Sequence, residues 1–306
     1  MNRVVAITGP TAIGKSALAD RLARRLDAPV ISADSMQVYR GMDIGTAKTP
    51  VSERLVPLLL IDVADPREAY SAACYQRDAR IEINRLLALG KVPILCGGTG
   101  LYLRAALDDM RFPKGVVDDD RRRAYQSILE AEGPQALYEM LKQRDPASAQ
   151  IVHPHNVKRV IRALEMHDEG VSYADQAAGF STPVPVYDHV TFALTMDRAR
   201  LYQRIDDRVD IMMEQGLLDE VHGLLDAGLR EALTSMQAIG YKELIDYFDG
   251  ALSLDEAVTL IKQRSRRYAK RQLAWCRHDA RTQWIDMDSM TVDDAVEHVL
   301  SYLERP

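Results

Sequence analysis

Residues 9–16 are the part of this sequence whose residue types and spacing most directly support chemistry. They read Gly-Pro-Thr-Ala-Ile-Gly-Lys-Ser, follow a short apolar run and open a helical pattern of apolar residues. Strand, glycine loop and helix in this order are typical of a phosphate-binding loop, where backbone amides and the helix N-terminus hold an anion. The sequence therefore predicts a di- or triphosphate site made of Gly9, Pro10, Thr11, Ala12, Ile13, Gly14, Lys15 and Ser16. We expect Lys15 to reach the outer phosphate and Ser16 to be a ligand of Mg²⁺.

Asp34 and Thr99 each follow a predicted strand. Asp34 comes directly after the apolar stretch 29–33, and Thr99 lies in a Gly-Gly-Thr-Gly turn after the run 91–96. In open α/β sheets, ligands bind at the carboxyl ends of the strands, where both residues are expected. Asp34 fits a general base that takes a proton from an acceptor held above the loop, or a magnesium ligand or helix cap. Thr99 fits either a hydrogen bond to the acceptor or a plain helix N-cap.

A phosphate loop usually binds a nucleoside triphosphate, which favours a kinase or NTPase. Such enzymes need a second acidic magnesium ligand at the end of another strand. Here the run 92–96 ends in glycines, and Asp62 lies in what reads as a turn after 58–61. We therefore expect the loop to hold a pyrophosphate that leaves, with a small-molecule or nucleoside kinase as the alternative. A non-catalytic RNA-binding module of the NTPase type is a third hypothesis.

The elements that must position these residues alternate along the first part of the chain. Apolar runs at 4–7, 29–33, 58–63 and 91–96 alternate with helical patterns, which predicts a parallel α/β sheet with helices on both faces. Between about 116 and 180 the sequence carries only helical signals, so we predict a small all-helical insert at 113–187. The predicted phosphate-loop core is then 1–112 and 188–306. A returning strand is expected at 189–196, helices at 198–214, 217–227, 240–248, 254–278 and 291–304, and a short apolar pair at 284–285.

Composition describes an ordinary globular protein, with 306 residues, 47% of them hydrophobic and 27% charged. No apolar run approaches membrane-spanning length, and the first strand begins almost at Met1, so we expect neither a membrane segment nor a secretion signal. Cys74, Cys96 and Cys276 are odd in number and far apart, which is typical of reduced thiols rather than of a disulfide framework or a zinc site. We expect a cytoplasmic monomer.

Positive charge is concentrated in one stretch of an otherwise acidic chain. The net charge is −6, yet residues 262–281 carry a local charge of about +7. This is the footprint expected of a contact with a nucleic-acid backbone. A solvated helix face whose cations pair with acids from elsewhere in the fold would show the same pattern, and spacing alone does not separate the two.

Several motifs together resemble the tRNA dimethylallyltransferase family in its bacterial form. They are 9–16, 34–48 (Asp-Ser-Met-Gln-Val-Tyr-Arg-Gly-Met-Asp-Ile-Gly-Thr-Ala-Lys), 97–102 (Gly-Gly-Thr-Gly-Leu-Tyr), 162–165, 240–243 and 269–275. The match runs in order from residue 4 to about residue 277. One departure is Ala274, where the family usually has threonine before the tryptophan.

The resemblance implies transfer of a dimethylallyl group from dimethylallyl pyrophosphate to N6 of adenosine 37, in the tRNA anticodon loop. It implies that Lys15, the loop amides and Mg²⁺ hold the pyrophosphate, with Arg208 as a further ligand. Asp34 would take the N6 proton, and Thr99 would orient Asp34 or the base. Adenosine 37 would have to be flipped out of its stack to reach the donor.

The resemblance also implies a set of tRNA contacts, which shifts the interpretation of the basic stretch towards function. In the insert, Lys158 and Arg162 are four residues apart and share a helical face. The implied contacts are Asp34, Ser35, Met36, Gln37, Thr99, Arg122, Lys158, Arg159, Val160, Ile161, Arg162, Gln237, Ala238, Ile239, Gly240, Tyr241, Lys242, Lys270, Arg271, Gln272, Leu273, Ala274, Trp275, Cys276 and Arg277.

Overall fold

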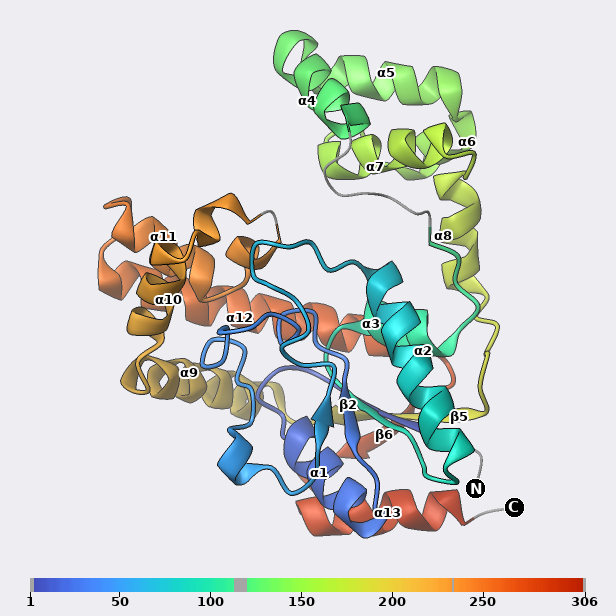
Figure 1. Ribbon diagram of the computed structural model, residues 1–306, viewed down its shortest axis with the longest axis vertical. Coiled ribbons are helices and arrows are strands. Elements are labelled where there is room, and N and C mark those ends of the chain that lie inside the picture. The colour runs from blue at the N-terminus through green and yellow to red at the C-terminus, as the bar shows by residue number, and fades with distance from the viewer. Residues whose placement is uncertain (1–2, 113–119, 233, 305–306) are drawn as a thin grey trace. The chain divides into compact units, whose positions relative to one another are not determined.

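A parallel sheet carries the candidate site. Within the residues that the computed structural model describes, which are 3–112, 120–232 and 234–304, six strands form this sheet in the order β3-β2-β4-β1-β5-β6 (Figure 1). The strands are β1 (Val4–Thr8), β2 (Val30–Ser32), β3 (Leu58–Leu59), β4 (Ile94–Cys96), β5 (His189–Thr195) and β6 (Gln283–Asp286). Every pair of neighbours is parallel. The predicted α/β class is confirmed.

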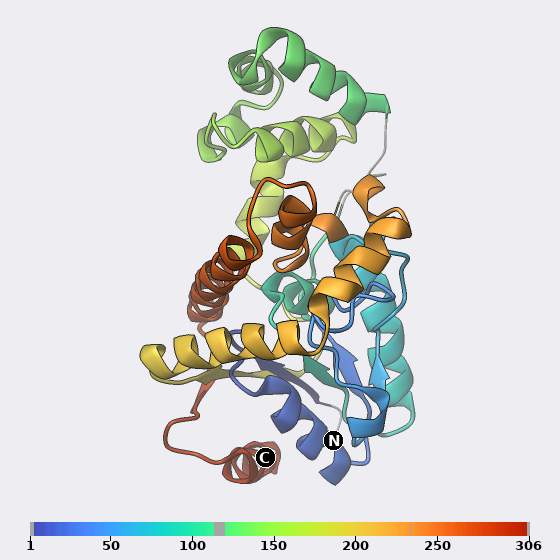
Figure 2. The same cartoon turned by 90° about the vertical axis from the view of Figure 1, so that its left-hand side faces the viewer.

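Alternate residues of β1 point to the two faces of the sheet, as the pleat of a strand requires. Val4 and Ala6 belong to one apolar core, and Val5 and Ile7 belong to another. All of β1 is buried, as expected of a central strand covered on both faces. Figures 1 and 2 show α2 (Ala72–Ala88) and α3 (Gly100–Leu107) on one side, with α1 (Lys15–Arg25) and α13 (Val292–Leu303) on the other.

The remaining helices around the sheet follow β5 and agree with the sequence pattern to within a residue or two. They are α9 (Arg198–Glu214), α10 (Leu217–Asp226), α11 (Tyr241–Phe248) and α12 (Leu254–Arg277), with single 3₁₀ turns η1 (Val51–Glu53), η2 (Leu229–Glu231) and η3 (Ser235–Gln237). Ser253 caps α12 by accepting from the amide of Glu256, whose carboxylate accepts from the Ser253 amide in return. These long amphipathic helices are predictable because their capping and periodicity are local.

The third strand is shorter than the apolar run 58–63 predicts. Only Leu58–Leu59 pairs with β2, because Leu60 and Asp62 adopt positive φ angles of 59° and 56° and turn the chain away. Asp62 therefore does not end a strand. Its carboxylate instead lies 2.5 Å from the ammonium of Lys48, whose side chain is buried, so this aspartate serves an internal ion pair.

The chain divides into two compact units, Met1–Leu107 with Tyr187–Pro306, and Asp108–Val186. The second unit begins five residues before the predicted start of the insert at 113, and it ends one residue before the predicted end at 187. Its described elements are α4 (Asp120–Glu132), α5 (Pro134–Arg144), α6 (Pro146–Ile151), α7 (Val157–Asp168) and α8 (Tyr173–Ser181). They enclose their own core around Leu137, Leu141 and Leu164. The predicted start of the helical signals, 116–119, lies outside the described residues.

None of the helices in the described part of the chain combines the length and the apolar character that crossing a membrane requires.

Candidate active site

The loop between β1 and α1 has the backbone that a phosphate loop needs. Gly9 has a φ of 137°, and a Cβ at this position would lie 2.9 Å from the carbonyl oxygen of Leu194, so a side chain does not fit. Gly14 has a φ of 105° and forms the N-cap of α1. The Nζ of Lys15 donates to the carbonyl of Pro10 at 2.8 Å, which places the ammonium across the loop.

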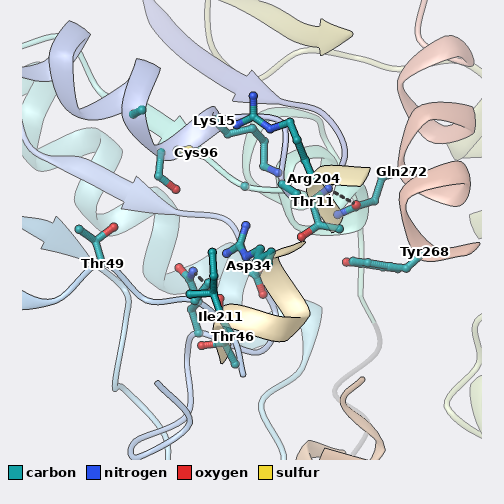
Figure 3. Close-up of a pocket in the computed structure, with 18 of the residues that line it drawn as sticks. Thr11, Lys15, Asp34, Thr46, Thr49, Cys96, Arg204, Ile211, Tyr268 and Gln272 are labelled. Atoms are coloured by element: carbon teal, nitrogen blue, oxygen red, sulfur yellow. Dashed lines mark hydrogen bonds between the residues drawn. The ribbon is translucent and has the colours of Figure 1, made fainter. Parts of the chain in front are cut away.

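Gln272 ties this loop to the second glycine turn. Its side chain is buried, and its Oε1 accepts from the amide of Thr11 at 2.8 Å (Figure 3). Its Nε2 donates to the carbonyl of Gly98 at 3.1 Å. A Cβ on Gly98 would lie 2.0 Å from that Nε2, and a Cβ on Gly97 would lie 2.1 Å from the carbonyl of Ala33. The glycines therefore allow three segments of backbone to meet beside the phosphate loop.

Asp34 follows β2, at the carboxyl edge of the sheet where the sequence places it. One of its carboxylate oxygens accepts from the amide of Met36 at 2.9 Å. The hydroxyl of Thr99 accepts from the amide of Ser35 at 3.0 Å and lies 3.3 Å from the Ser35 hydroxyl. Thr99 thus holds the residue next to Asp34, and it lines neither of the two cavities described below.

A cavity of about 410 Å³ brings most of the predicted phosphate ligands together with Asp34, but Gly9, Pro10 and Ile13 do not line it. Gly14, Lys15, Ser16, Asp34 and Arg208 all line it. Figure 3 labels Lys15 and Asp34 among the lining side chains. Sequence reasoning missed other lining residues: Gln37, which it assigned to tRNA only, and Thr46, Thr49, Arg204, Asp207 and Tyr268. Arg204 precedes Arg208 by four residues on α9, so helical spacing was the signal that could have found it.

The cations of this cavity are held at an electrostatic cost. Burial lowers the pKa of the Lys15 ammonium, and Arg208 lowers it further, while Cys96 and Asp34 raise it. Burial also lowers the pKa of Arg208; Asp34 opposes this shift and the like charge of Arg204 adds to it. Since a buried anion would relieve both the desolvation and the repulsion, this arrangement fits a strongly negative ligand.

A second cavity of about 280 Å³ adjoins the first. Both are lined by Thr11, Ala12, Asp34, Thr46, Arg208 and Tyr268, so the Asp34 carboxylate lies where they meet. Burial raises the pKa of Tyr268 to about 12, and the charge of Asp34 adds to the shift. The rest of the lining is mostly apolar, with Met36, Met212, Ile239 and Ile261 among it, and polar groups at Gln237, Ser265 and Arg271.

The sequence and the fold of this chain match those of known proteins. The family model described as IPP transferase matches residues 37–279, and the model described as isopentenyl transferase matches residues 2–57. The tRNA dimethylallyltransferase of Geobacillus thermodenitrificans is 46% identical over 304 residues, covering 98% of this chain and 96% of the relative. This chain belongs to the tRNA dimethylallyltransferase family. The members of this family are named as transferases. This favours neither the kinase hypothesis nor the hypothesis of a non-catalytic RNA-binding module.

Solved structures of tRNA dimethylallyltransferases share the fold. The full-length tRNA isopentenylpyrophosphate transferase of Bacillus halodurans is 44% identical, has a TM-score of 0.72, and is matched over 99% of this chain and 96% of its own. A eukaryotic dimethylallyltransferase described as acting on tRNA is 29% identical with a TM-score of 0.84, over 100% of this chain and 81% of its own.

The tRNA contacts that family resemblance implies separate by burial. Ser35, Met36, Gln237, Ile239 and Arg271 line the second cavity beside Asp34. The side chains of Val160 and Ile161 lie in the core of the second unit, and those of Ala238, Tyr241, Gln272 and Cys276 are buried in the first. Of these buried residues, Ala238 and Tyr241 also line the second cavity and Gln272 lines the first, so they can still contact a bound group there. The side chains of Val160 and Ile161 belong to the apolar core of the second unit.

The cations of the basic stretch at 262–281 fall into two groups, those with an acidic partner and those without one. Lys262, Arg264 and Arg266 pair with Asp210, Glu243 and Asp206 at 2.5–2.6 Å, which is the behaviour of a salt-bridged helix face. Arg267, Lys270 and Arg277 are exposed and have no acidic partner among the described residues. They recur every three to seven residues and form one stripe of α12, so the tRNA hypothesis applies to this stripe rather than to the whole stretch.

Cations of the second unit also differ in their partners. Arg122 and Arg162 both pair with Glu165, at 3.2 and 3.4 Å. Lys158 and Arg159 are exposed at the start of α7 and have no acidic partner in the described ranges.

Oxygen donors suited to Mg²⁺ line the first cavity. The hydroxyls of Ser16, Thr46 and Thr49 and the carboxylate of Asp34 are hard ligands of the kind that magnesium prefers. No group of three or more His, Cys, Asp or Glu side chains in the described ranges could hold a metal on its own. This donor set fits an ion that is bound through one or two protein oxygens and completed by phosphate and water.

Proposed function

We propose that this protein transfers a dimethylallyl group from dimethylallyl pyrophosphate to N6 of adenosine 37 in the tRNA anticodon loop, releasing pyrophosphate. Membership of the tRNA dimethylallyltransferase family supports prenyl transfer to tRNA. The observation that carries the assignment of roles is the position of Asp34, which lines both the cavity of the phosphate loop and the adjoining apolar cavity.

The first cavity would bind the diphosphate of the donor. Lys15, Arg208 and the loop amides surround it, and they would stabilise the charge that develops as the bond between C1 and the diphosphate oxygen breaks. Mg²⁺ bound with the donor would add Lewis-acid stabilisation of the leaving group, with Ser16 as its protein ligand. Arg204, one turn from Arg208, extends the same positive wall.

The second cavity would receive the flipped base. Flipping costs a few kcal/mol, and apolar surface such as Met36 and Ile239 offsets this cost by contact with the extruded purine. N6 would then face Asp34 and the donor carbon. As the new bond between N6 and C1 forms, the carboxylate of Asp34 would take the N6 proton, so that neutral modified adenine and pyrophosphate are the products.

The exposed cations would hold the RNA backbone. In the first unit these are Arg267, Lys270 and Arg277 on α12, and in the second unit Lys158 and Arg159 on α7. Anticodon loops are single-stranded, which is where proteins read RNA bases, while phosphate contacts position the molecule.

The test is transfer of labelled dimethylallyl pyrophosphate to an anticodon stem-loop containing A36-A37-A38, without added ATP. Wild-type protein should label N6 of adenosine 37, identified by mass spectrometry of the nucleosides. Asp34→Ala should lower kcat by roughly 10²- to 10⁴-fold, the usual worth of a general base. Asp226→Asn, an exposed aspartate on α10, is the matched control and should keep wild-type turnover. Normal turnover of Asp34→Ala would remove the assigned base.

A further inference from the structure

The carboxylate of Glu220 on α10 accepts hydrogen bonds from a loop that lines both cavities. Its Oε2 accepts from the amides of Asp43 and Ile44 at 2.9 and 2.7 Å, and its Oε1 accepts from the amide of Gly45 at 3.2 Å. The Tyr241 hydroxyl donates to the same Oε1 at 2.6 Å. A carboxylate offers about four acceptor sites, so these donors saturate it.

Tyr241 completes the contact by packing against the loop. A Cβ on Gly45 would lie 2.5 Å from Cε2 of the Tyr241 ring, so glycine permits the ring to lie against the backbone. The tyrosine is fully buried at the start of α11. Glu220 therefore joins three segments that are distant in sequence: the loop 43–45, α10 and α11.

Hydrogen bonds and ion pairs from Lys48 hold another part of the loop. The Nζ of Lys48 donates to the carbonyl of Tyr39 at 2.6 Å and to the carboxylates of Asp43 and Asp62 at 2.7 and 2.5 Å. Lys48 thus fixes the base of the loop, whereas Glu220 fixes the three consecutive amides at its tip.

The loop, and not Glu220, faces the candidate site. Gly45 lines the second cavity, and Thr46 lines both cavities. The carbonyl of Thr46 also accepts from Nε2 of Gln37 at 3.1 Å, and the Oε1 of Gln37 accepts from the hydroxyl of Ser32 at 2.9 Å. The position of the loop thus sets the shape of the space around Asp34.

We propose that Glu220 is a positioning residue for prenyl transfer, which holds the loop 43–46 so that both cavities keep their shape beside Asp34. This inference rests on the proposed function. Glu220 lines neither cavity in the described structure, so it acts through the loop and not on either substrate. Without its carboxylate, three amides have no acceptor, and the loop is free to leave the position that Thr46 requires.

The main experiment compares Glu220→Gln with Glu220→Asp, using Asp219→Asn as the matched control on the same helix. Asp219 is exposed, and its carboxylate has no hydrogen-bond partner among the described residues. Glu220→Gln should raise KM for the donor and for the stem-loop by roughly tenfold each, because a wall common to both cavities moves. Glu220→Asp keeps the charge and should restore part of the affinity, and Asp219→Asn should match wild type. Unchanged KM values in Glu220→Gln, measured well below its melting temperature, would overturn the proposal.

Amide hydrogen exchange of residues 43–45 tests the same hydrogen bonds without turnover. In the absence of substrates, Glu220→Gln should exchange these amides roughly tenfold faster than wild type, since their acceptor is weakened. Tyr241→Phe leaves the three amide bonds in place and should show a smaller increase. Unaltered exchange in Glu220→Gln would overturn the inference even if wild-type protein transfers the prenyl group. Failure of wild-type protein to transfer it would instead remove the proposed function, with the exchange result standing by itself.

Discussion

At the scale of single residues, the site depends on glycines, which have no side chain, as much as on residues that carry functional groups. Asp34 and the phosphate loop lie beside one another because Gly97 and Gly98 let backbone and Gln272 approach within distances that a Cβ would forbid. Gln272 then bridges Thr11 and Gly98 from the buried face of α12. Close backbone contact is thus the means by which a carboxylate is brought to an anion site.

Gly97→Ala tests this dependence. The new Cβ would lie 2.1 Å from the carbonyl oxygen of Ala33, so strand β4 and the segment before Asp34 must move apart. The free energy of unfolding should fall by about 1–3 kcal/mol, the usual cost of overpacking. Gly223→Ala on α10 is the control, because nothing lies within 4 Å of its Cβ, and it should be neutral or stabilise the protein by about 0.5–1 kcal/mol. Denaturant unfolding measures both, and equal stabilities would contradict the account.

At the scale of elements, α12 combines several roles on different faces. Ala269, Gln272 and Cys276 are buried, one group of cations pairs with acids on α9 and α11, and Arg267, Lys270 and Arg277 remain as an exposed stripe. The net charge of the helix is therefore a poor measure of its surface. What matters for RNA is the subset of cations whose charge is not already neutralised.

Salt dependence separates the two groups of cations on α12. Changing Arg267, Lys270 and Arg277 together to glutamine should weaken stem-loop binding and lower the slope of log K against log salt by about 0.7–0.9 for each RNA phosphate that is no longer neutralised. Lys262→Gln, whose lysine pairs with Asp210 at 2.6 Å, should leave the slope unchanged. Neither variant should alter KM for the donor. If the two variants changed the slope equally, the division of the helix into paired and exposed faces would have no functional meaning.

At the scale of the whole molecule, the helical unit is an insertion with close attachment points. The chain enters it at Asp108 and leaves it at Val186, and Asp108 forms an antiparallel backbone bridge with Pro185, supported by a 2.7 Å bond from the Asp109 amide to the Val184 carbonyl. The unit has its own apolar core. We therefore expect the sheet unit to fold without the core or the chain length of the insertion.

Replacing residues 108–186 by a short Gly-Ser linker should leave the sheet unit folded and able to bind the donor. Stem-loop affinity should fall by about tenfold or more, because the exposed cations Lys158 and Arg159 are removed with the insert. Circular dichroism and donor titration establish the folded state, and binding of the stem-loop measures the decrease in affinity. A deletion variant that folds and binds the stem-loop like wild type would exclude the insert from tRNA binding.

The sequence alone determined the local features of this protein. Spacing within a few residues specified the phosphate loop, the strand before Asp34, the helices after β5 and the change to a purely helical insert, because hydrogen bonding and amphipathic burial within one element repeat with a fixed period. The motif order was also sufficient to indicate the family. These features needed no knowledge of which elements lie next to one another.

Only the tertiary structure decided which partners those elements meet. It paired Asp206, Asp210 and Glu243 with three of the eight cations of the basic stretch, and it buried Gln272 between two loops. It also placed Glu220 on amides about 175 residues earlier in the chain. Interactions of this kind depend on packing across long sequence separations, and no periodicity in the chain records the partner.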